Sequence, residues 1–326
     1  MITPRLCAPA YELGEYAEPV ADLPELQADP AIAAELTSPA AGFDTYRWSD
    51  APVVELMAAA VQRTLGEAGV PGDEVDLVLL ATDSLPQGRA AQRDVAELLT
   101  ETGLTRATAS TLGLMDCATA MAALGTAASL VRDGSARHVL VVSGDLADLA
   151  AGGDRVVAGG VAIASDAAAS ALVSATAPGL PVLGMAHHTS PPTASGGGAR
   201  KELSAKVTAH RELFARLAAH HPHRPEDVRA VLPSHFARMV LEIYLSDVGH
   251  GGDKLALDNV GRIAHCLGSD PLIDLADRLA GTDPAGARTA HGTDDGHLVL
   301  LGAGISHLAA VLLGARPLPD ASEGAL

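Results

Sequence analysis

Cysteine is scarce in this chain. Only three of the 326 residues are cysteine, at positions 7, 117 and 266, and no two of them have a Cys-x-x-Cys spacing. An odd and widely spaced set does not form a disulfide framework, and it lacks the paired spacing of a structural zinc site. We therefore expect any important cysteine to act as a free thiol, and we expect no bound metal.

Positive charge is also scarce. The chain has 22 Lys and Arg against 40 Asp and Glu, a formal net charge of −18. A nucleic-acid surface needs clustered Lys and Arg, so nucleic acid is excluded as a partner. The charge is uneven, because residues 11–50 carry nine acids and one base, whereas residues 199–224 carry six bases and two acids. The second stretch is interpreted either as a solvated helix face or as a docking site for an acidic carrier protein.

Aromatic residues and long apolar runs are missing. Phe, Trp and Tyr make up 2% of the chain, which excludes a site built on stacked rings and favours an aliphatic pocket. No apolar run reaches the roughly 18 residues of a membrane span, and the N-terminal stretch lacks the pattern of a signal peptide. These absences predict a cytoplasmic protein without a membrane partner. The Gly-rich GAGISH at 302–307 lacks the third glycine of a dinucleotide fingerprint, so no cofactor is expected.

The chain contains a weak internal repeat. A helical pattern at 53–69 leads through a Pro-acid turn into an apolar run ending near residue 84. The stretches 211–223 and 224–236 repeat this order of helix, turn and apolar run. Such alternation predicts an α/β protein with parallel strands, built from two similar halves.

Glycine and proline interrupt this pattern at two places. One interruption, at 175–185, predicts a boundary between an N-terminal half, 1–178, and a C-terminal half, 179–326. The other, 189–201, is rich in Gly, Ser and Pro and predicts a mobile loop.

Cys117 stands at the start of a helix-forming segment, CATAMAALGTAASLV, and Asp116 before it is a typical capping residue. In a first helical turn, the free N–H groups and the helix dipole lower the pKa of a thiol, and the same N–H groups can bind an oxyanion. The alternative is a small buried cysteine that packs the helix against a strand.

Three stretches resemble one known family. LMDCATAMAALGTAASLVRDGSARHVLVVSGD, which contains Cys117, resembles the nucleophile segment of the ketoacyl synthase III family. The stretch SDAAASALVSA (165–175) resembles the strand after that family's acidic glycine-rich turn, and LVLLGAGISHLAAVLLGARP (298–317) resembles its C-terminal glycine loop and last strand. The resemblance covers about residues 53–317. It implies a thiolase-like fold, in which two duplicated βα halves form a layered α-β-α-β-α core, and a cysteine that carries an acyl group as a thioester.

The sequence departs from the condensing enzymes of this family at both partners of the cysteine. At their Pro-His-Gln position it reads LPSHFARM, so either Ser234 replaces the histidine or His235 takes its place with a shift of one residue. At their Gly-Asn turn it has a histidine, and His265, Gly268 and Asp270 match a His-x-x-Gly-x-Asp motif. This motif is similar to that of the synthase III-like acyltransferases of natural-product pathways, which move an acyl group onto an alcohol or amine.

The resemblance implies a ping-pong acyl transfer. Cys117 would take the acyl group from a CoA or acyl-carrier-protein thioester, His265 would deprotonate the hydroxyl of a small-molecule acceptor, and Asp270 would fix the imidazole tautomer. Backbone N–H groups would hold the oxyanion; the candidates are those of Cys117, Gly302, Ala303 and Gly304. The resemblance also implies a homodimer, with residues 82–92 near the partner's pocket.

Several alternatives remain open at this point. His265 is otherwise a core or helix-capping histidine, and Asp270 is otherwise, or additionally, the N-cap of the following helix. Ser234, His235 and His188 are candidate pocket residues or structural ones. Two other functions fit the same sequence: a decarboxylating condensing enzyme that uses His235 and His265 to stabilise an enolate, and a non-catalytic subunit that pairs with an active homologue.

Overall fold

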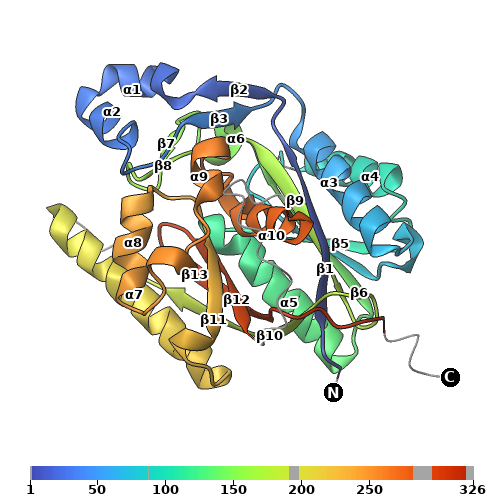
Figure 1. Ribbon diagram of the computed structural model, residues 1–326. Helices are drawn as coiled ribbons and strands as arrows, with labels where there is room; N and C mark the ends of the chain where they lie inside the picture. The colour runs from blue at the N-terminus through green and yellow to red at the C-terminus, as the bar shows by residue number, and fades with distance from the viewer. Residues whose placement is uncertain (1, 87, 191–197, 282–295, 321–326) are drawn as a thin grey trace.

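A large mixed sheet forms the centre of the protein (Figure 1). The computed structural model describes residues 2–86, 88–190, 198–281 and 296–320. In this part of the chain nine strands form one sheet in the order β11-β12-β13-β10-β1-β9-β6-β4-β5. The strands are β1 (Arg5–Leu13), β4 (Leu77–Ala81), β5 (Thr108–Leu112), β6 (His138–Asp145), β9 (Ala167–Ser174), β10 (Leu180–Thr189), β11 (Val228–Pro233), β12 (His297–Ala303) and β13 (His307–Gly314).

The sheet contains the same strand order twice. In one half β1, β9, β6 and β4 are neighbours, with two antiparallel pairings followed by a parallel one. In the other half β10, β13, β12 and β11 repeat this series. The halves meet where β1 pairs with β10, with Leu6 opposite Leu180. The boundary predicted between residues 178 and 179 lies in the connection between β9 and β10.

The prediction of parallel strands is correct only in part. Among the described strands, β4 is parallel to β5 and β6, and β11 is parallel to β12, whereas the other pairings of the large sheet are antiparallel. The strands β12 and β13 are separated by residues 304–306 alone. A parallel crossover needs about a dozen residues or more, so this short connection permits only a hairpin.

Helices form three layers around the two sheet halves. The α-helices of the described chain are α1 (Pro24–Ala28), α2 (Pro30–Leu36), α3 (Val53–Ala68), α4 (Arg89–Glu101), α5 (Thr119–Asp133), α6 (Ala147–Ala150), α7 (Gly198–His220), α8 (Arg238–Ser246), α9 (Asp258–Ile263) and α10 (Asp270–Ala280). Both α5 and α10 contact strands of both halves and form the middle layer. Figure 1 shows α3 and α4 on one side of this core and α7 and α8 on the other. This is the expected α-β-α-β-α layering.

The middle helix α5 is buried because of its sequence. Its residues are mainly small and apolar, and ten of its fifteen side chains are buried, including Met121, Leu124 and Val131. Alanine favours the helix and lets strands approach on both sides. Gly134, with φ 84°, ends the helix in the left-handed conformation that glycine adopts without strain.

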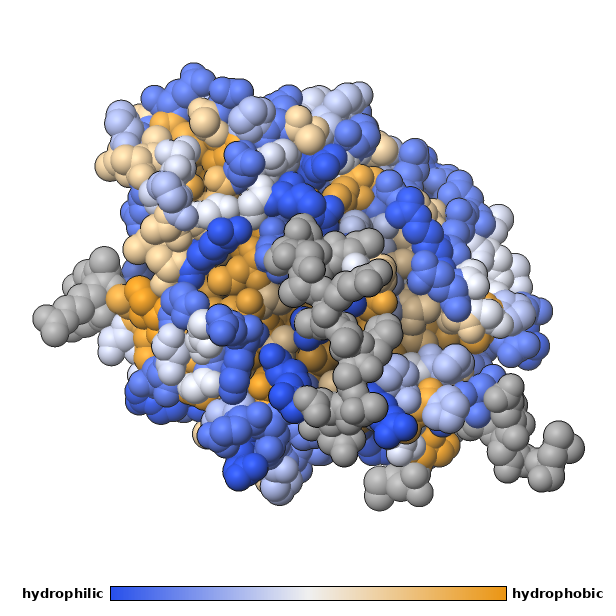
Figure 2. All heavy atoms as spheres, viewed as in Figure 1, coloured by the Kyte–Doolittle hydropathy of each residue, from blue (hydrophilic) through white to orange (hydrophobic). Residues whose placement is uncertain are grey.

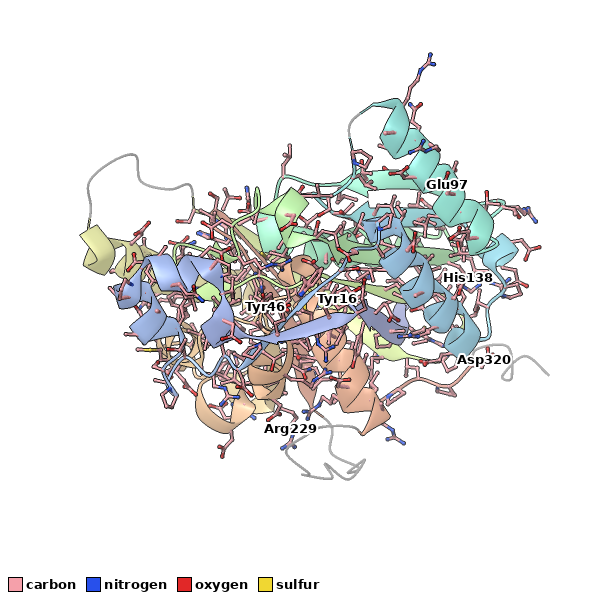
Figure 3. The ribbon with its side chains drawn as sticks, turned by 90° about the horizontal axis from the view of Figure 1, so that it is seen from above. Tyr16, Tyr46, Glu97, His138, Arg229 and Asp320 are labelled. Atoms are coloured by element: carbon pink, nitrogen blue, oxygen red, sulfur yellow. The ribbon has the colours of Figure 1, made fainter. Side chains whose placement is uncertain are left out.

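The first 50 residues, which the family resemblance did not cover, contribute β1 to the central sheet and form a small strand pair with two helices beside it. The strands β2 (Tyr16–Pro19) and β3 (Thr45–Trp48) pair with each other, and α1 and α2 lie between them in the sequence. Tyr16 stacks on Trp48 with ring centroids 4.2 Å apart. Figure 3 shows Tyr16 and Tyr46 on this strand pair, well separated from Glu97 on α4. A further short pair, β7 (Val156–Val157) with β8 (Ala162–Ile163), lies close to the candidate site described below.

The prediction of a mobile loop at 189–201 is wrong for its last residues. The helix α7 begins at Gly198 and not near residue 211, so residues 198–201 are helical, while residues 191–197 lie outside the described residues. The sequence from Ala199 onward contains Ala, Arg, Lys, Glu and Leu, which favour a helix. These propensities extend the helix up to the Gly-rich run.

The surface in Figure 2 is mainly hydrophilic, with smaller hydrophobic areas between polar residues. No helix of the described chain combines the length and the apolar composition that crossing a membrane requires.

Candidate functional site

Cys117 lies in a single 3-10 turn, Asp116–Ala118, directly before α5. The turn is approached through a distorted backbone, because Leu114 and Asp116 have φ angles of 65° and 48°. Non-glycine residues in this left-handed region are strained by about 1–3 kcal/mol each and persist where their surroundings hold them. The thiol is therefore presented at the end of the central helix by a fixed loop.

His265 is held in a second distorted segment. Its backbone N–H donates to the carbonyl oxygen of Ile163 and its carbonyl oxygen accepts from the N–H of Ser165, both at 2.8 Å. Its neighbours Ala264 and Leu267 have φ angles of 51° and 52°. In the described chain, four of the six non-glycine residues with positive φ thus flank either the cysteine or this histidine.

The structure brings together the three residues that the sequence selected as catalytic. Sγ of Cys117 lies 3.1 Å from Nε2 of His265, and Nδ1 of His265 lies 2.5 Å from Oδ2 of Asp270. A carboxylate only accepts hydrogen bonds, so Nδ1 carries the imidazole proton and Nε2 is free to accept the thiol proton. The three side chains form a nucleophile, a base and an orienting acid in series.

Asp270 acts as a hydrogen-bond acceptor within the loop and not as a helix cap. It is the first residue of α10, and the N-cap residue Ser269 makes no side-chain cap bond. Its Oδ1 accepts from the backbone N–H of Cys266 at 2.6 Å, and its Oδ2 accepts from the backbone N–H of His235 at 2.7 Å. Burial raises the pKa of Asp270, but the charge of His235 and the hydrogen bonds from the imidazole of His265 and the backbone N–H of His235 outweigh it and leave that pKa below its usual range. Asp270 is therefore a carboxylate at neutral pH.

The expected lowering of the Cys117 pKa is wrong. Burial, and then the negative charges of Asp270, Asp116 and Asp145, raise the pKa of this thiol well above its usual range, although its own backbone N–H opposes the shift. A few N–H dipoles at a helix end do not compensate for desolvation next to carboxylates. The resting site is a neutral thiol beside an imidazole, so the thiolate has to be formed during attack on the donor, with His265 as the base.

The raised pKa predicts how Cys117 reacts with iodoacetamide. The thiolate fraction increases about tenfold per pH unit below the thiol pKa, so the alkylation rate of the Cys117 peptide should keep rising from pH 6 to pH 9. Peptide-resolved mass spectrometry measures this rate separately from that of Cys7, whose burial raises its pKa to about 12. A plateau in the Cys117 rate near neutral pH would show a preformed thiolate and contradict the prediction.

A cavity of about 300 Å³ opens onto Cys117 and His265. Apart from these two, its lining residues are Asp83, Asp116, Asp145, Ala150, Ala151, Val156, Val157, Ala158, Gly159, Leu267, Gly268, Gly304 and Ile305. Burial raises the pKa of Asp145 to about 7, although Asp83 N–H and the hydroxyl of Ser84 donate to it. The sequence analysis missed Asp145, which ends β6; its position at the carboxyl end of a strand was the available signal.

The expected oxyanion loop is largely occupied by internal hydrogen bonds. The N–H of Gly304 donates to the carbonyl oxygen of His307 at 2.8 Å, and the N–H of Ala303 donates to Oγ of Ser234 at 3.0 Å. A Cβ at Gly302 would lie 2.7 Å from the carbonyl oxygen of Cys117, so this loop packs directly on the nucleophile turn. The N–H of Cys117 itself stays the main candidate for oxyanion binding.

Asp116 does not cap the helix. Its Oδ2 accepts from the backbone N–H groups of Ile305 and Ser306, at 3.1 and 3.3 Å. The side chain therefore ties the nucleophile turn to the hairpin that connects β12 and β13.

The three candidate pocket residues lie outside the lining of this cavity among the described residues. Ser234 accepts from Ala303 as above, and His188 lies on β10 with Nδ1 3.3 Å from Oε2 of Glu212. His235 is completely buried and has carboxylate neighbours on α10, with Nε2 3.0 Å from Oδ1 of Asp274. Asp274 also accepts a hydrogen bond from Nδ2 of Asn259. Neither residue was predicted from the sequence, because neither belongs to a motif.

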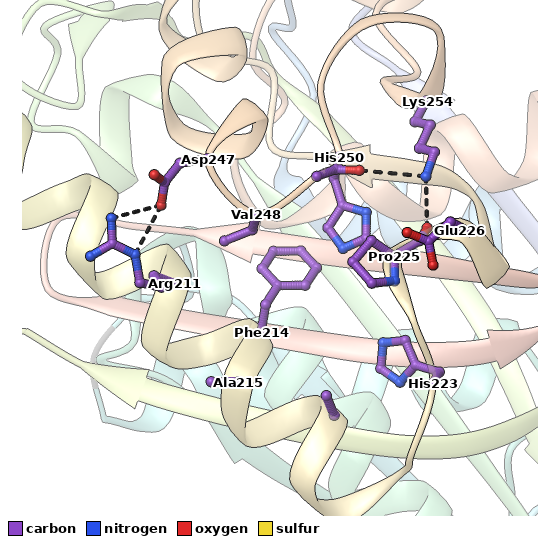
Figure 4. A pocket seen from close by; sticks show the side chains of 12 residues that line it. Arg211, Phe214, Ala215, His223, Pro225, Glu226, Asp247, Val248, His250 and Lys254 are labelled. Atoms are coloured by element: carbon purple, nitrogen blue, oxygen red, sulfur yellow. Dashed lines mark hydrogen bonds and ion pairs between the residues drawn. The ribbon is translucent and has the colours of Figure 1, made fainter.

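Within the basic stretch 199–224, the described side chains of Lys206, Arg211 and Arg216 contact the protein itself. Arg211 pairs with Asp247 at 2.8 Å beside a separate cavity of about 560 Å³, seen in Figure 4. Arg216 donates to the carbonyl oxygen of His187, and Lys206 donates to the carbonyl oxygens of Gly304 and Ile305. The described residues contain no cluster of three or more His, Cys, Asp or Glu that could hold a metal ion.

Comparison with known proteins agrees with this architecture. Residues 114–191 match the family model of 3-oxoacyl-[acyl-carrier-protein] synthase III. No curated protein matches the sequence. A synthase III from Aquifex aeolicus VF5 is 17% identical, with a TM-score of 0.76 over 95% of this chain and 99% of that one. ChlB3, described as an acyltransferase, is 20% identical with a TM-score of 0.76 over 98% and 99%. Cerulenin-bound OleA of Xanthomonas campestris is 14% identical with a TM-score of 0.76 over 96% and 100%.

The comparisons and the topology agree on one fold. The matched segment 114–191 contains the cysteine turn, the central helix α5 and the strands β6 and β9, whereas the structural similarity extends over almost the whole chain. The chain has the thiolase-like fold of these synthase III, ChlB3 and OleA structures, and its segment 114–191 matches the synthase III family model.

Proposed function

We propose that the protein is an acyltransferase that moves an acyl group from a CoA or acyl-carrier-protein thioester, through an acyl-cysteine at Cys117, onto a hydroxyl group of a small-molecule acceptor in natural-product biosynthesis. An amine is the second acceptor type. The observation that carries this proposal is the contact series Cys117–His265–Asp270, with 3.1 Å and 2.5 Å between the reacting atoms. A histidine oriented by a carboxylate suits removal of a proton from an alcohol.

The first half-reaction forms the acyl-enzyme. Nε2 of His265 takes the thiol proton of Cys117 while Sγ attacks the thioester carbonyl. The N–H of Cys117 stabilises the oxyanion. The C–S bond of the donor then breaks, and the departing thiolate takes the proton from Nε2. Asp270 stabilises the transient imidazolium throughout, because it is a buried carboxylate bonded to Nδ1.

The second half-reaction transfers the acyl group. Nε2 of His265 takes the proton of the acceptor hydroxyl, whose oxygen attacks the acyl carbonyl. The bond to Sγ breaks, and Cys117 recovers its proton from Nε2. Neither half-reaction needs a cofactor, because the proton of Cys117 leaves with the donor thiol and the proton of the acceptor hydroxyl replaces it on Sγ.

The charge of the cavity supports this reaction over decarboxylative condensation. Three of the lining residues carry carboxyl groups, Asp83, Asp116 and Asp145, and no Lys or Arg is among the described residues of the lining. A malonyl donor would bring its own carboxylate next to these carboxyl groups, and like charges repel. A neutral hydroxyl or a protonated amine meets no such repulsion.

The test uses the purified protein with a panel of acyl thioesters. We expect the Cys117 peptide to gain the acyl mass and to lose it when an alcohol acceptor is added, with ester appearing in solution. Cys117→Ala is the control that should gain no mass. Release of CO2 together with a ketoacyl product from a malonyl carrier would overturn the proposal of ester formation. A protein that takes up no acyl group from any donor would instead indicate a non-catalytic subunit.

We propose that the protein forms a homodimer along the free edge of the sheet. Among the described strands, β5 pairs only with β4, and Thr108, Ser110 and Thr111 on it are exposed. Leu114 beyond its end is 90% exposed. A second copy paired at this edge would cover Leu114 and bring its own residues 82–92 near the cavity.

Carrier recognition by α7 gives a separate prediction. Charge reversal in Arg216→Glu should raise the KM for a carrier-bound donor about 3–10-fold, because a carrier of negative charge would meet a less positive helix. The KM for the CoA-bound donor should be unchanged. Arg63→Glu is the matched control, since Arg63 is also a partly exposed arginine on an outer helix and pairs with Glu12. An unchanged carrier KM in Arg216→Glu would remove α7 from the docking surface.

A further inference from the structure

His235 lies behind the catalytic residues, and both its ring nitrogens face acceptors. Nδ1 lies 2.7 Å from the carbonyl oxygen of Ala264, and Nε2 lies 3.0 Å from Oδ1 of Asp274. A carbonyl and a carboxylate can only accept, so each nitrogen has to donate, which requires the imidazolium form. Burial lowers the pKa of His235, but the charges of Asp270 and Asp274 raise it to about 9. His235 is thus a permanent buried cation at neutral pH.

Two buried carboxylates share this cation. Nδ1 of His235 lies 3.1 Å from Oδ1 of Asp270. The other oxygen of Asp270, Oδ2, accepts the hydrogen bond from Nδ1–H of His265. Asp274 accepts through Oδ1 from His235 and from Nδ2 of Asn259 at 2.8 Å, while its Oδ2 has no hydrogen-bond partner among the described residues. Burial raises the pKa of Asp274, while the charge of His235 and the hydrogen bonds from His235 and Asn259 lower it. With both carboxyl groups ionised, two negative charges and one positive charge leave one negative charge in the cluster.

Cys266 and Asn259, which also lie near His235, carry no charge. Burial and the nearby carboxylates raise the pKa of Cys266 well above its usual range, so it is a thiol. Asn259 is an amide, and His265 has Nε2 free to accept the proton of Cys117. During acyl transfer the only new positive charge in the cluster is therefore the one that appears on His265.

We propose that His235 is a positioning residue whose fixed positive charge holds the buried cluster of Asp270, Asp274 and His235 at one net negative charge, which the imidazolium of His265 neutralises during acyl transfer. This inference rests on the proposed function. Charges in a buried site interact strongly, so a cluster with one charge too many or too few would change the protonation of its members. Without the cation, one of the two carboxyl groups would take up a proton, and Asp270 would no longer be a reliable acceptor for His265. Without Asp274, the cation would neutralise Asp270 and leave nothing to balance the imidazolium of His265.

A four-variant cycle tests the charge balance. His235→Gln and Asp274→Asn should each slow acylation of Cys117 by a plain acyl thioester about 10–100-fold, the range found for residues that orient a ligand from behind. The double variant lacks both the cation of His235 and the carboxylate of Asp274, so the single negative charge of Asp270 remains. The two new amide side chains can still donate and accept a hydrogen bond. We expect the double variant to recover to within about tenfold of the unmodified protein. Residues that interact directly show such non-additivity.

The matched control uses a carboxylate one turn further along α10. Asp277 is paired with Arg262 at 2.6 Å and accepts from the hydroxyl of Tyr11. It shares the Nδ2 donor of Asn259 with Asp274, but its charge is balanced by the arginine. Combining Asp277→Asn with His235→Gln should give no recovery. Thermal unfolding of every variant shows whether each one is folded.

The outcomes separate the inference from the proposed function. Additive losses in the double variant, or unchanged acylation in folded His235→Gln, would overturn the charge balance. Recovery equally large with Asp277→Asn would also overturn it, because the effect would then not be confined to the cluster. If the unmodified protein does not acylate Cys117, the proposed function fails instead, before His235 is considered.

Discussion

Cys117→Ser is expected to reduce acyl transfer by about 10⁴–10⁶-fold, the range seen when the nucleophile of a catalytic triad is removed. A serine hydroxyl holds its proton far more tightly than a thiol does, and His265 already has to remove the thiol proton in a buried site beside carboxylates. Serine also forms an ester that is less reactive than a thioester toward the acceptor. Intact-protein mass spectrometry after incubation with an acyl thioester, together with product assay, measures both steps.

The control for this loss is a second buried thiol away from the cavity. Cys7 lies in β1, is 1% exposed and contacts the backbone of Ala177, so Cys7→Ala should acylate and turn over like the unmodified protein. Acylation that persisted in Cys117→Ser but vanished in Cys7→Ala would show that Cys7 is the nucleophile, and it would contradict the mechanism.

His265→Ala is expected to slow both half-reactions by about 10²–10⁴-fold. The reason is the protonation state of the resting site: since the pKa of Cys117 is raised, little thiolate is present to attack the donor without a base. A lowered thiol pKa would give a different result, in which acylation continues and only transfer to the acceptor fails. Single-turnover measurement of acyl-enzyme formation and of its decay with acceptor separates these cases.

Two further measurements, on a matched histidine variant and with added imidazole, complete the test of His265→Ala. His188 is also buried but lies beside Glu212 outside the cavity lining, so His188→Ala should retain both half-reactions. Added imidazole should partly restore acylation in His265→Ala, because the removed side chain leaves room next to Sγ. Acylation of His265→Ala at the normal rate would contradict the neutral thiol.

The sequence was sufficient to predict the features that depend on local pattern. The helical period at 53–69 gives α3, and the apolar run HVLVVSGD gives β6. The spacing of His265 and Asp270 selected two residues that do lie together with Cys117. A motif predicts that two such side chains lie close together, because residues five positions apart in one loop can adopt few relative arrangements.

The features that the sequence did not predict depend on contacts between distant segments. The direction of the Cys117 pKa shift comes from burial and then from carboxyl groups, the first of which is Asp270 in the other half of the chain. Asp116 was assigned to the helix beside it but bonds the hairpin 304–306, almost 190 residues away. The partnership of His235 with Asp274 joins the end of β11 to α10. The burial of these residues and the charges around them are set only when the two halves pack together, so a local sequence pattern does not predict them.

The position of β1 affects how the protein is made. The strand β1 lies between β9 and β10 in the centre of the sheet, and its partners are the much later residues 167–174 and 180–181. About 160 residues must be synthesised before Arg5–Leu13 finds either neighbour, so the N-terminal strand waits as an unpaired edge during synthesis. At a rate of about 5–20 residues per second this interval lasts roughly ten to thirty seconds. A chaperone that shields this single strand would therefore protect the whole sheet from mispairing.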